Sequence, residues 1–207
     1  VQELWHSKLH KILCLSTENR TFSFCDKSMC PLFVAKERKE VSDSGDGGPY
    51  GEITPFPETL SLGYDSSCNL SCITCRKGLH YAKGEELESV NRITEKAIKE
   101  YLPHCKFLIM AGSGEVFASP AYRKVYESAE CNPKYIRLLS NGTLFTPANW
   151  ERFVKGKNAK IMLTASVDAA TKETYGLIRQ GGNFDMLKKN MEFASQLRKN
   201  GDLCYFR

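Results

Sequence analysis

Short apolar runs alternate with segments of helical period along most of the chain after residue 56. Continuous apolar runs of four to six residues are typical of buried strands, whereas apolar residues three and four positions apart indicate one-sided helices. Their alternation predicts repeated strand–helix units around a parallel sheet. The expected strands are 59–64, 107–110, 135–139, 161–165 and a fifth beginning at 203; the expected helices are 85–102, about 121–129, one beginning at Pro147, and 184–197.

Polar residues or glycines follow each of the first four expected strands. In parallel α/β folds this edge of the sheet is where ligands and catalytic groups lie. The pattern therefore predicts an α/β fold of four strand–helix units and the start of a fifth. Because the last strand leaves a sheet edge unpaired and the chain starts at Val1, we expect a segment of a longer chain, with further strands beyond Arg207.

A charged, turn-forming stretch separates the strand–helix region from the N-terminus. Residues 36–40 read Lys-Glu-Arg-Lys-Glu and residues 43–49 read Asp-Ser-Gly-Asp-Gly-Gly-Pro, a composition that packs poorly and turns easily. We therefore expect a linker at 36–55. It is expected to join a small cysteine-containing module at 1–35 to a main domain at 56–207.

Composition and charge narrow the functional classes. The 207 residues are 42% apolar and 26% charged, which is enough to form a packed core. Twenty-nine Lys and Arg against 24 Asp and Glu leave a net charge of +5, a mild excess without the clustered basic stripe of a nucleic-acid-binding protein. The sequence has neither a run of 18 apolar residues nor an export signal. We expect a cytoplasmic protein that binds neither membrane nor nucleic acid.

The chain has nine cysteines, and we expect it in a reducing compartment. Under those conditions the cysteines are expected to be metal ligands or reactive thiols and not to form disulfides. Three of them, Cys68, Cys72 and Cys75, form a C-x3-C-x2-C motif directly after the first expected strand. Three soft thiolates on one loop suit an iron–sulfur cluster, and three ligands for four irons leave one iron open to another ligand. A zinc site or plain core thiols remain alternatives, although zinc commonly takes four ligands and only His80 lies nearby in sequence.

This motif after the first strand resembles the radical S-adenosylmethionine (SAM) superfamily, and the resemblance covers residues 59–207. It implies a partial (βα)6 barrel, similar to a TIM barrel, that ends after about four and a half units. It also implies that a 4Fe–4S cluster on the three cysteines accepts an electron from a donor such as flavodoxin or ferredoxin and cleaves SAM to a 5′-deoxyadenosyl radical, which abstracts a substrate hydrogen. The chain departs from many members at Thr74, where they carry an aromatic residue.

A glycine-rich turn after the second strand is similar to the family's Gly-Gly-Glu segment, which binds the amino group of SAM. It consists of Gly112, Ser113, Gly114 and Glu115, with Ser113 in place of the first glycine of the pair. Glycines let the backbone approach a ligand closely. Taken alone, such a turn is also common where no ligand binds.

Polar residues after the third and fourth strands resemble positions that contact the ribose or carboxylate of SAM. They are Ser140 and Asn141, then Ser166 and Asp168, with Arg179 as the candidate partner of the carboxylate. Hydroxyl and amide groups satisfy ribose hydroxyls, and an arginine forks onto a carboxylate. Other roles stay open, because Ser-Asn-Gly is a common turn, Asp168 can cap the next helix and Arg179 can be a solvated charge.

The N-terminal module contains Cys25 and Cys30, with Cys14 upstream. It is similar to the tail of the cysteine-rich SPASM extension of radical SAM peptide maturases, although that extension follows the barrel in the family. The resemblance implies an auxiliary iron–sulfur cluster on Cys25 and Cys30, with Cys14 as a further candidate. A zinc site or no metal is equally compatible with three cysteines. The remaining cysteines, Cys105, Cys131 and Cys204, are expected to be buried free thiols.

The expected substrate follows from the resemblance. The stretch 174–184 and the cysteine-containing module are similar to family members that act on peptides, so we expect a radical SAM enzyme with a peptide or protein substrate. A small molecule, such as a sugar or nucleoside derivative, is the second hypothesis. A metal-binding protein without catalysis is the third.

Overall fold

The computed structural model describes residues 2–18, 21, 23–24, 26, 55–110 and 113–207. Three of the expected site residues, Cys25, Cys30 and Gly112, lie outside this part of the chain, as does nearly all of the expected linker. The chain divides into two compact units, Val1–Phe56 and Pro57–Arg207.

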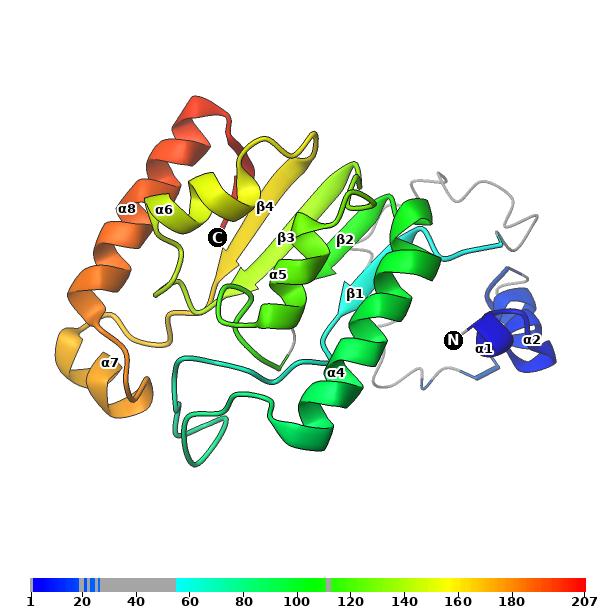
Figure 1. Cartoon of the computed structure of the whole chain (residues 1–207), viewed down its shortest axis with the longest axis horizontal. Coiled ribbons are helices and arrows are strands. Elements are labelled where there is room, and N and C mark those ends of the chain that lie inside the picture. The colour runs from blue at the N-terminus through cyan, green and yellow to red at the C-terminus, as the bar shows by residue number, and fades with distance from the viewer. Residues whose placement is uncertain (1, 19–20, 22, 25, 27–54, 111–112) are drawn as a thin grey trace. The chain divides into compact units, whose positions relative to one another are not determined.

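The second unit is built on a five-stranded parallel sheet with the strand order β1-β2-β3-β4-β5 (Figure 1). Helices separate the strands along the chain, so the predicted α/β fold is confirmed. The first strand ends two residues earlier than expected, and the fourth begins one residue earlier. The strands are β1 Thr59–Leu62, β2 Phe107–Met110, β3 Tyr135–Ser140, β4 Lys160–Ala165 and β5 Leu203–Phe206.

Helices α5, α6, α7 and α8 of this unit begin at side chains that cap them. Ser119, Thr146, Thr171 and Asn183 each accept a hydrogen bond from a backbone N–H of the first turn, which satisfies a donor that the helix leaves free. The helices are α4 Gly84–Lys96, α5 Pro120–Glu127, α6 Pro147–Asn149, α7 Lys172–Ile178 and α8 Phe184–Asn200; π-helical turns at Ala97–Tyr101 and Trp150–Val154 extend α4 and α6.

The hydrophobic pattern does not predict α7. Its seven residues span about two turns, which is too few to show a helical period. The longer helices, in contrast, lie close to their expected bounds, because each has an apolar face that repeats over several turns.

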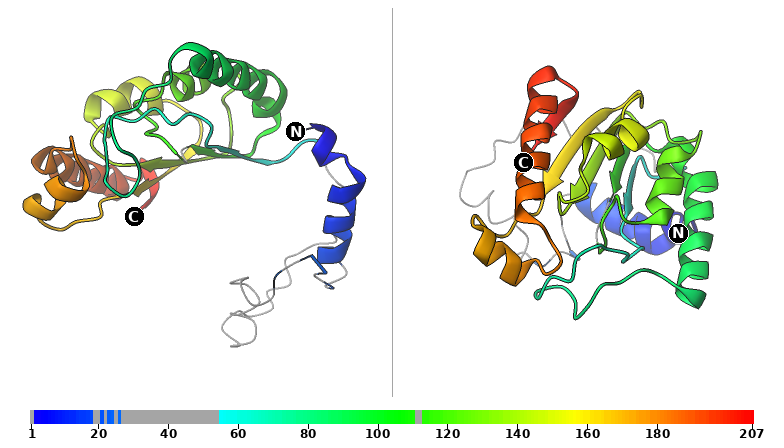
Figure 2. Two further views of the ribbon diagram at one scale, coloured as in Figure 1. Left: turned by 90° about the horizontal axis from the view of Figure 1, so that it is seen from below. Right: turned by 60° about the vertical axis from the view of Figure 1, so that its left-hand side comes forward.

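Neighbouring strands in this sheet are also neighbours in sequence. A doubly wound sheet reverses its strand order at one point, whereas consecutive units of a βα barrel do not. Helices α4, α5 and α6 lie on the same face of the sheet (Figure 2). The arrangement is therefore that of successive barrel units, as expected from the sequence.

The main core lies between the sheet and these helices. Along β2 and β3 every second residue is buried, so one face of the sheet carries the apolar side chains and the other is only half-buried. Burying each large apolar side chain contributes about 1.5–3 kcal/mol. The fully buried side chains of the central strands are Leu108, Met110, Ile136, Leu138 and Leu163.

The described residues of the first unit include the helices α1 Gln2–Trp5 and α2 Lys8–Glu18. The Ser7 hydroxyl accepts a hydrogen bond from the backbone N–H of His10 at 3.1 Å and caps α2. Cys14 lies on α2, where its Sγ is 3.4 Å from Nε2 of His10. The auxiliary cluster stays a prediction, because its other two cysteines lie outside the described residues.

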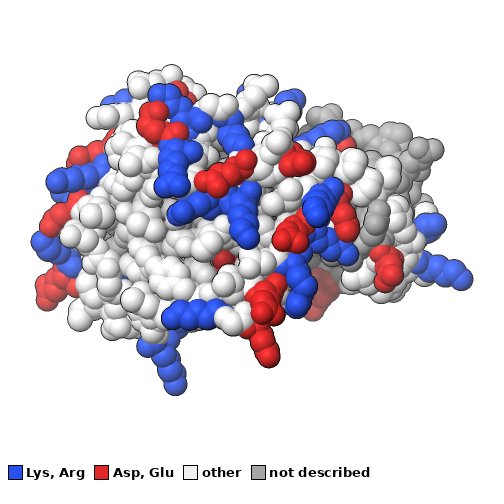
Figure 3. Space-filling view, in the orientation of Figure 1, with Lys and Arg blue, Asp and Glu red and all other residues white. Residues whose placement is uncertain are grey.

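Charged side chains of both signs are interspersed over the face shown in Figure 3. Ion pairs between exposed side chains of the second unit include Lys172–Asp185 and Lys155–Glu151. Among the described helices, none is long and apolar enough to cross a membrane.

Candidate functional site

The three motif cysteines lie on the segment between β1 and α4, residues 63–83, which we call the cysteine loop (Figure 1). The backbone N–H of Cys68 donates to the carbonyl of His80 at 2.8 Å and closes the loop on itself. The N–H of Ser71 donates to the carbonyl of Gln180 at 3.0 Å. The segment after α7 therefore lies against the cysteine loop, although the two are far apart in sequence.

The three thiols border one cavity of about 170 Å³. Cys68 and Cys72 are buried, whereas Cys75 is exposed. The backbone N–H groups of Cys75 and Arg76 both donate to the carbonyl of Cys72 at 3.0 Å, so a tight turn joins the last two cysteines. In the described part of the chain, no three His, Cys, Asp or Glu side chains converge closely enough to hold a single metal ion.

Most of the cofactor-binding residues expected from the sequence border the same cavity. They come from the ends of β2, β3 and β4 and from the segment after α7, which the parallel sheet brings to one edge. Glu115 and Asp168 do not border the cavity. Glu115 accepts hydrogen bonds from two residues that do, and Asp168 forms an ion pair with a third. The bordering residues are Ser113, Gly114, Ser140, Asn141, Ser166 and Arg179.

Arg179 reaches the cavity with its guanidinium group. Nη1 lies 3.5 Å from Sγ of Cys72, and Nη2 forms an ion pair with Oδ2 of Asp168 at 2.7 Å. Only 11% of the side chain is exposed, so Arg179 is not a solvated charge, and its buried Nε has no hydrogen-bond partner among the described residues. Asp168 orients this arginine and does not cap α7, because Thr171 caps it.

Glu115 is fully buried and joins the ends of β2 and β3. Its carboxylate accepts hydrogen bonds from the Ser140 hydroxyl at 2.7 Å, the Asn141 N–H at 2.6 Å and the Phe117 N–H at 3.3 Å. Burial raises the pKa of Glu115, and these hydrogen bonds act in the opposite direction. The carboxylate therefore holds two cavity residues in place, and a direct contact with SAM stays a prediction.

Gly114 lies where the turn after β2 crosses the cysteine loop. A Cβ atom at this position would lie 2.5 Å from the carbonyl oxygen of Asp65 and 2.6 Å from that of Ser67. The next residue, Glu115, donates its N–H to the same Ser67 carbonyl at 2.8 Å. The glycine is thus needed for close contact between two protein segments.

Asn141 contacts the first cysteine. Its Nδ2 lies 3.8 Å from Sγ of Cys68 and donates to Oδ1 of Asn69 at 3.0 Å. Its Oδ1 accepts from the Thr143 hydroxyl at 2.6 Å, and Asn69 donates to that hydroxyl at 2.9 Å. Burial raises the pKa of the Cys68 thiol, mainly by desolvating the thiolate.

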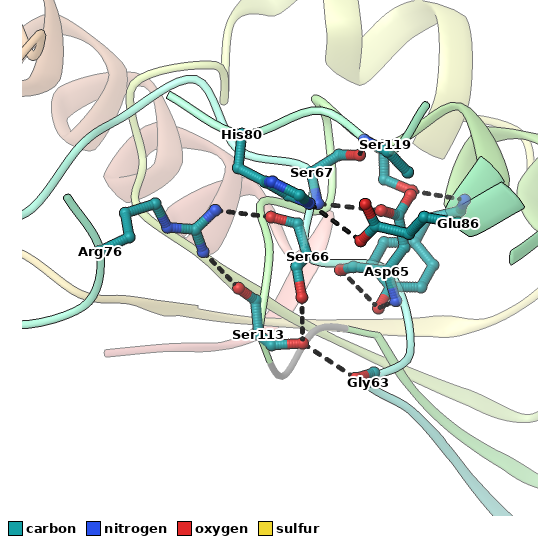
Figure 4. Close-up of polar contacts among 11 residues, drawn as sticks. Gly63, Asp65, Ser66, Ser67, Arg76, His80, Glu86, Ser113 and Ser119 are labelled. Carbon is teal, nitrogen blue, oxygen red and sulfur yellow. Dashed lines mark hydrogen bonds and ion pairs between the residues drawn. The ribbon is translucent and has the colours of Figure 1, made fainter. Parts of the chain in front are cut away.

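Arg76 bridges the cysteine loop and the turn after β2 (Figure 4). Nη1 donates to the carbonyl of Ser66 at 2.6 Å, and Nη2 donates to the carbonyl of Ser113 at 2.5 Å. Nη2 also lies 3.6 Å from Sγ of Cys75. Arg76 also borders a larger cavity of about 540 Å³, which is lined by Cys75, Ser113 and His80 as well.

A buried carboxylate anchors the start of the cysteine loop. Asp65 accepts hydrogen bonds from the N–H of Ser67 at 2.9 Å and the hydroxyl of Ser119 at 2.5 Å (Figure 4). Ser119 is also the N-cap of α5. The loop is thereby fastened to the helix that follows β2.

Asn69 and Arg76 are not among the site residues predicted from the sequence. Each is the immediate neighbour of a motif cysteine, and each contacts a cysteine sulfur or a residue that does. Adjacency to the motif is the only signal that the sequence contains for them, because their partners lie in distant segments.

Comparisons with known proteins give distant structural matches. No family model and no curated protein matches the chain. Native anSMEcpe with bound AdoMet is 22% identical over 72% of this chain and 42% of that protein, with a TM-score of 0.43. Native anSMEcpe with bound AdoMet and Cp18Cys peptide is 23% identical over 72% of this chain and 41% of that protein, also with a TM-score of 0.43.

Streptococcus suis SuiB bound to S-adenosylmethionine is 18% identical over 69% of this chain and 32% of that protein, with a TM-score of 0.44. The chain therefore spans less than half the length of the structures that it matches. It is similar to them, distantly, in its strand–helix fold.

Proposed function

We propose that the chain carries the catalytic centre of a radical SAM enzyme, in which Cys68, Cys72 and Cys75 hold a 4Fe–4S cluster. The observation that carries this proposal is that all three motif thiols border one cavity at the carboxyl edge of the sheet. When bound, such a cluster supplies the electron that cleaves SAM to a 5′-deoxyadenosyl radical, which abstracts a substrate hydrogen.

The donor set fits an iron–sulfur cluster. Three thiolates bring negative charge into a partly buried cavity, and N–H donors of Asn141, Arg179 and Arg76 lie against their sulfurs and offset that charge. A structural zinc ion needs a fourth ligand. The candidate that lies nearby in sequence, His80, pairs instead with Glu86 at 3.0 Å.

Residues around the cavity supply the groups that SAM requires. Arg179 binds the SAM carboxylate in this proposal. Its buried Nε has no hydrogen-bond partner among the described residues, which supports the role because a donor is left for a ligand. Asp168 orients the guanidinium group. The turn that contains Ser113 and Gly114 offers its backbone to the SAM amino group. Polar groups of Ser140, Asn141 and Ser166 are proposed to contact the rest of the cofactor.

The proposed function also includes a substrate class, an electron donor and a second cluster. We propose a peptide or protein substrate, on the resemblance of residues 174–184 to peptide-modifying members, and an electron donor such as flavodoxin or ferredoxin. An auxiliary iron–sulfur cluster on Cys25 and Cys30 is proposed for the N-terminal module. A small-molecule substrate is the second candidate, because the cavity contacts described above concern the cofactor alone.

Anaerobic reconstitution tests the proposed function. The full-length protein is expected to gain a reducible 4Fe–4S signal that SAM alters, and to release 5′-deoxyadenosine when it is reduced. Cys72→Ser is expected to lose the SAM-responsive signal and the release, whereas Cys204→Ser, which changes a cysteine of β5, is expected to keep both. Zinc binding without labile sulfide, or an unchanged signal in Cys72→Ser, would contradict the proposal.

A further inference from the structure

Arg76 makes a fork of hydrogen bonds that joins three parts of the site. Two of its nitrogens donate to backbone carbonyls, that of Ser66 at 2.6 Å and that of Ser113 at 2.5 Å (Figure 4). The nitrogen that donates to Ser113 also lies 3.6 Å from the Cys75 sulfur. Arginine suits this geometry because its planar guanidinium group carries several donors in fixed directions. A lysine carries the same charge without the fork.

Cys75 is the cysteine that most needs such support. Cys68 and Cys72 are buried and pack with Leu70, whereas Cys75 is exposed. The backbone of Cys75 is held by the turn that joins it to Cys72. Among the described residues, the Cys75 sulfur is contacted by the guanidinium group of Arg76. The position of its sulfur therefore depends on where Arg76 is held.

Arg76 and Arg179 carry the same charge, but the groups around the two guanidinium groups differ. Arg179 contacts the Cys72 sulfur, but Asp168 pairs with it at 2.7 Å and offsets its charge. Both carbonyl partners of Arg76 are neutral, and none of the carboxylates in the described residues forms an ion pair with it. Glu86, which borders the same larger cavity, pairs with His80.

We propose that Arg76 is a positioning residue that fixes the Cys75 sulfur and, by placing a cationic donor beside it, raises the reduction potential of the cluster. This inference rests on the proposed function, since it requires a cluster on the three cysteines. Hydrogen bonds to cluster sulfurs and nearby charge are two of the factors that set such potentials. A cation at this place stabilises the reduced cluster, which carries one more negative charge, and so eases the electron transfer that SAM cleavage needs.

The test compares cluster potentials in the full-length protein, by anaerobic redox titration followed by electron paramagnetic resonance. Arg76→Gln removes the charge and the fork, and is expected to lower the equilibrium constant for one-electron reduction at least tenfold, equivalent to about 59 mV. Arg76→Lys keeps the charge and is expected to lie between Arg76→Gln and the wild type. Lys77→Gln removes the same charge from the exposed neighbouring residue, where solvent and salt screen it, and is expected to shift the constant less than twofold.

Iron and sulfide content, measured on the same samples, separates the outcomes. If the wild type holds no cluster, the proposed function fails and this inference fails with it. If Arg76→Gln holds a full cluster at the wild-type potential, or Lys77→Gln shifts it equally, the role of Arg76 is refuted while the proposed function stands. If both Arg76 variants fold but lose iron while Lys77→Gln loads normally, the fixing of Cys75 is supported; equal loss in Lys77→Gln refutes it.

Discussion

Gly114 is a residue whose identity is explained by protein contacts before any ligand is considered. Its Cα faces the carbonyl oxygens of Asp65 and Ser67 so closely that a Cβ atom would lie 2.5 and 2.6 Å from them. Backbone atoms cannot turn aside as a flexible side chain can. The turn after β2 and the cysteine loop therefore keep their spacing only if this position lacks a side chain.

Gly114→Ala is expected to destabilise the protein by about 1–3 kcal/mol, because the added methyl group forces the two segments apart. Urea denaturation measures the change in the free energy of unfolding. Gly176→Ala is the matched control, because a Cβ atom there meets nothing within 4 Å and the residue lies inside α7, where alanine is favourable. The control is expected to unfold at the same or a higher urea concentration. Equal stability of Gly114→Ala and the wild type would contradict the contact.

The cysteine motif itself was predictable residue by residue, whereas its supporting side chains were not. Cys68, Cys72 and Cys75 stand within eight residues of one another, so their spacing is visible in the sequence. Arg76 acts through the carbonyl of Ser113, which is brought beside it only by the pairing of β1 with β2. A contact between residues that are far apart in sequence produces no pattern that can be recognised in the sequence around either residue.

At the scale of elements, α7 supports the cysteine loop although the two belong to different strand–helix units. The loop donates two backbone hydrogen bonds to the end of this helix and the segment after it, from Ser71 to Gln180 at 3.0 Å and from Ile73 to Ile178 at 3.1 Å. The same segment carries Arg179 into the cavity. We therefore expect the stability of this short helix to affect how firmly the cysteine loop is held.

Thr171→Ala removes the N-cap of α7 and is expected to weaken this helix by about 0.5–2 kcal/mol. Hydrogen exchange is the measurement, and the amides of Ser71 and Ile73 are expected to exchange faster than in the wild type because their acceptors lie at the helix end. Thr146→Ala removes the cap of α6 and is expected to leave these two amides unchanged. Unaltered protection in Thr171→Ala would show that α7 does not support the loop.

At the scale of the whole molecule, the parallel sheet gathers the candidate site. Each strand contributes little by itself, but all five run in one direction, so the segments after β1, β2, β3 and β4 meet at one edge. The cavity that results is bordered by residues from five separate parts of the second unit: the cysteine loop, the ends of β2, β3 and β4, and the segment after α7. A bound group that contacts several of them links these parts together.

Loading the cluster is therefore expected to stabilise the protein against heat. A ligand present at 100 times its dissociation constant adds about 2.7 kcal/mol to the folded state, which raises the Tm of a domain of this size by several degrees. Anaerobic thermal denaturation of loaded and unloaded protein measures the difference. The shift is expected to disappear in Cys72→Ser and to persist in Cys204→Ser; the same shift in both variants would place the cluster elsewhere.

The order of the five strands and of the longer helices, and the three-cysteine motif, could be predicted from the sequence, because apolar periodicity and ligand spacing are local properties of the chain. Three sets of contacts became visible only in the folded chain: Glu115 holds Ser140 and Asn141, Asp168 orients Arg179, and Arg76 contacts the sulfur of Cys75. The contacts of Glu115, and the bond from Arg76 to Ser113 that places Arg76 beside Cys75, join segments that are distant in sequence. They arise from strand pairing and packing, which no short window of residues encodes.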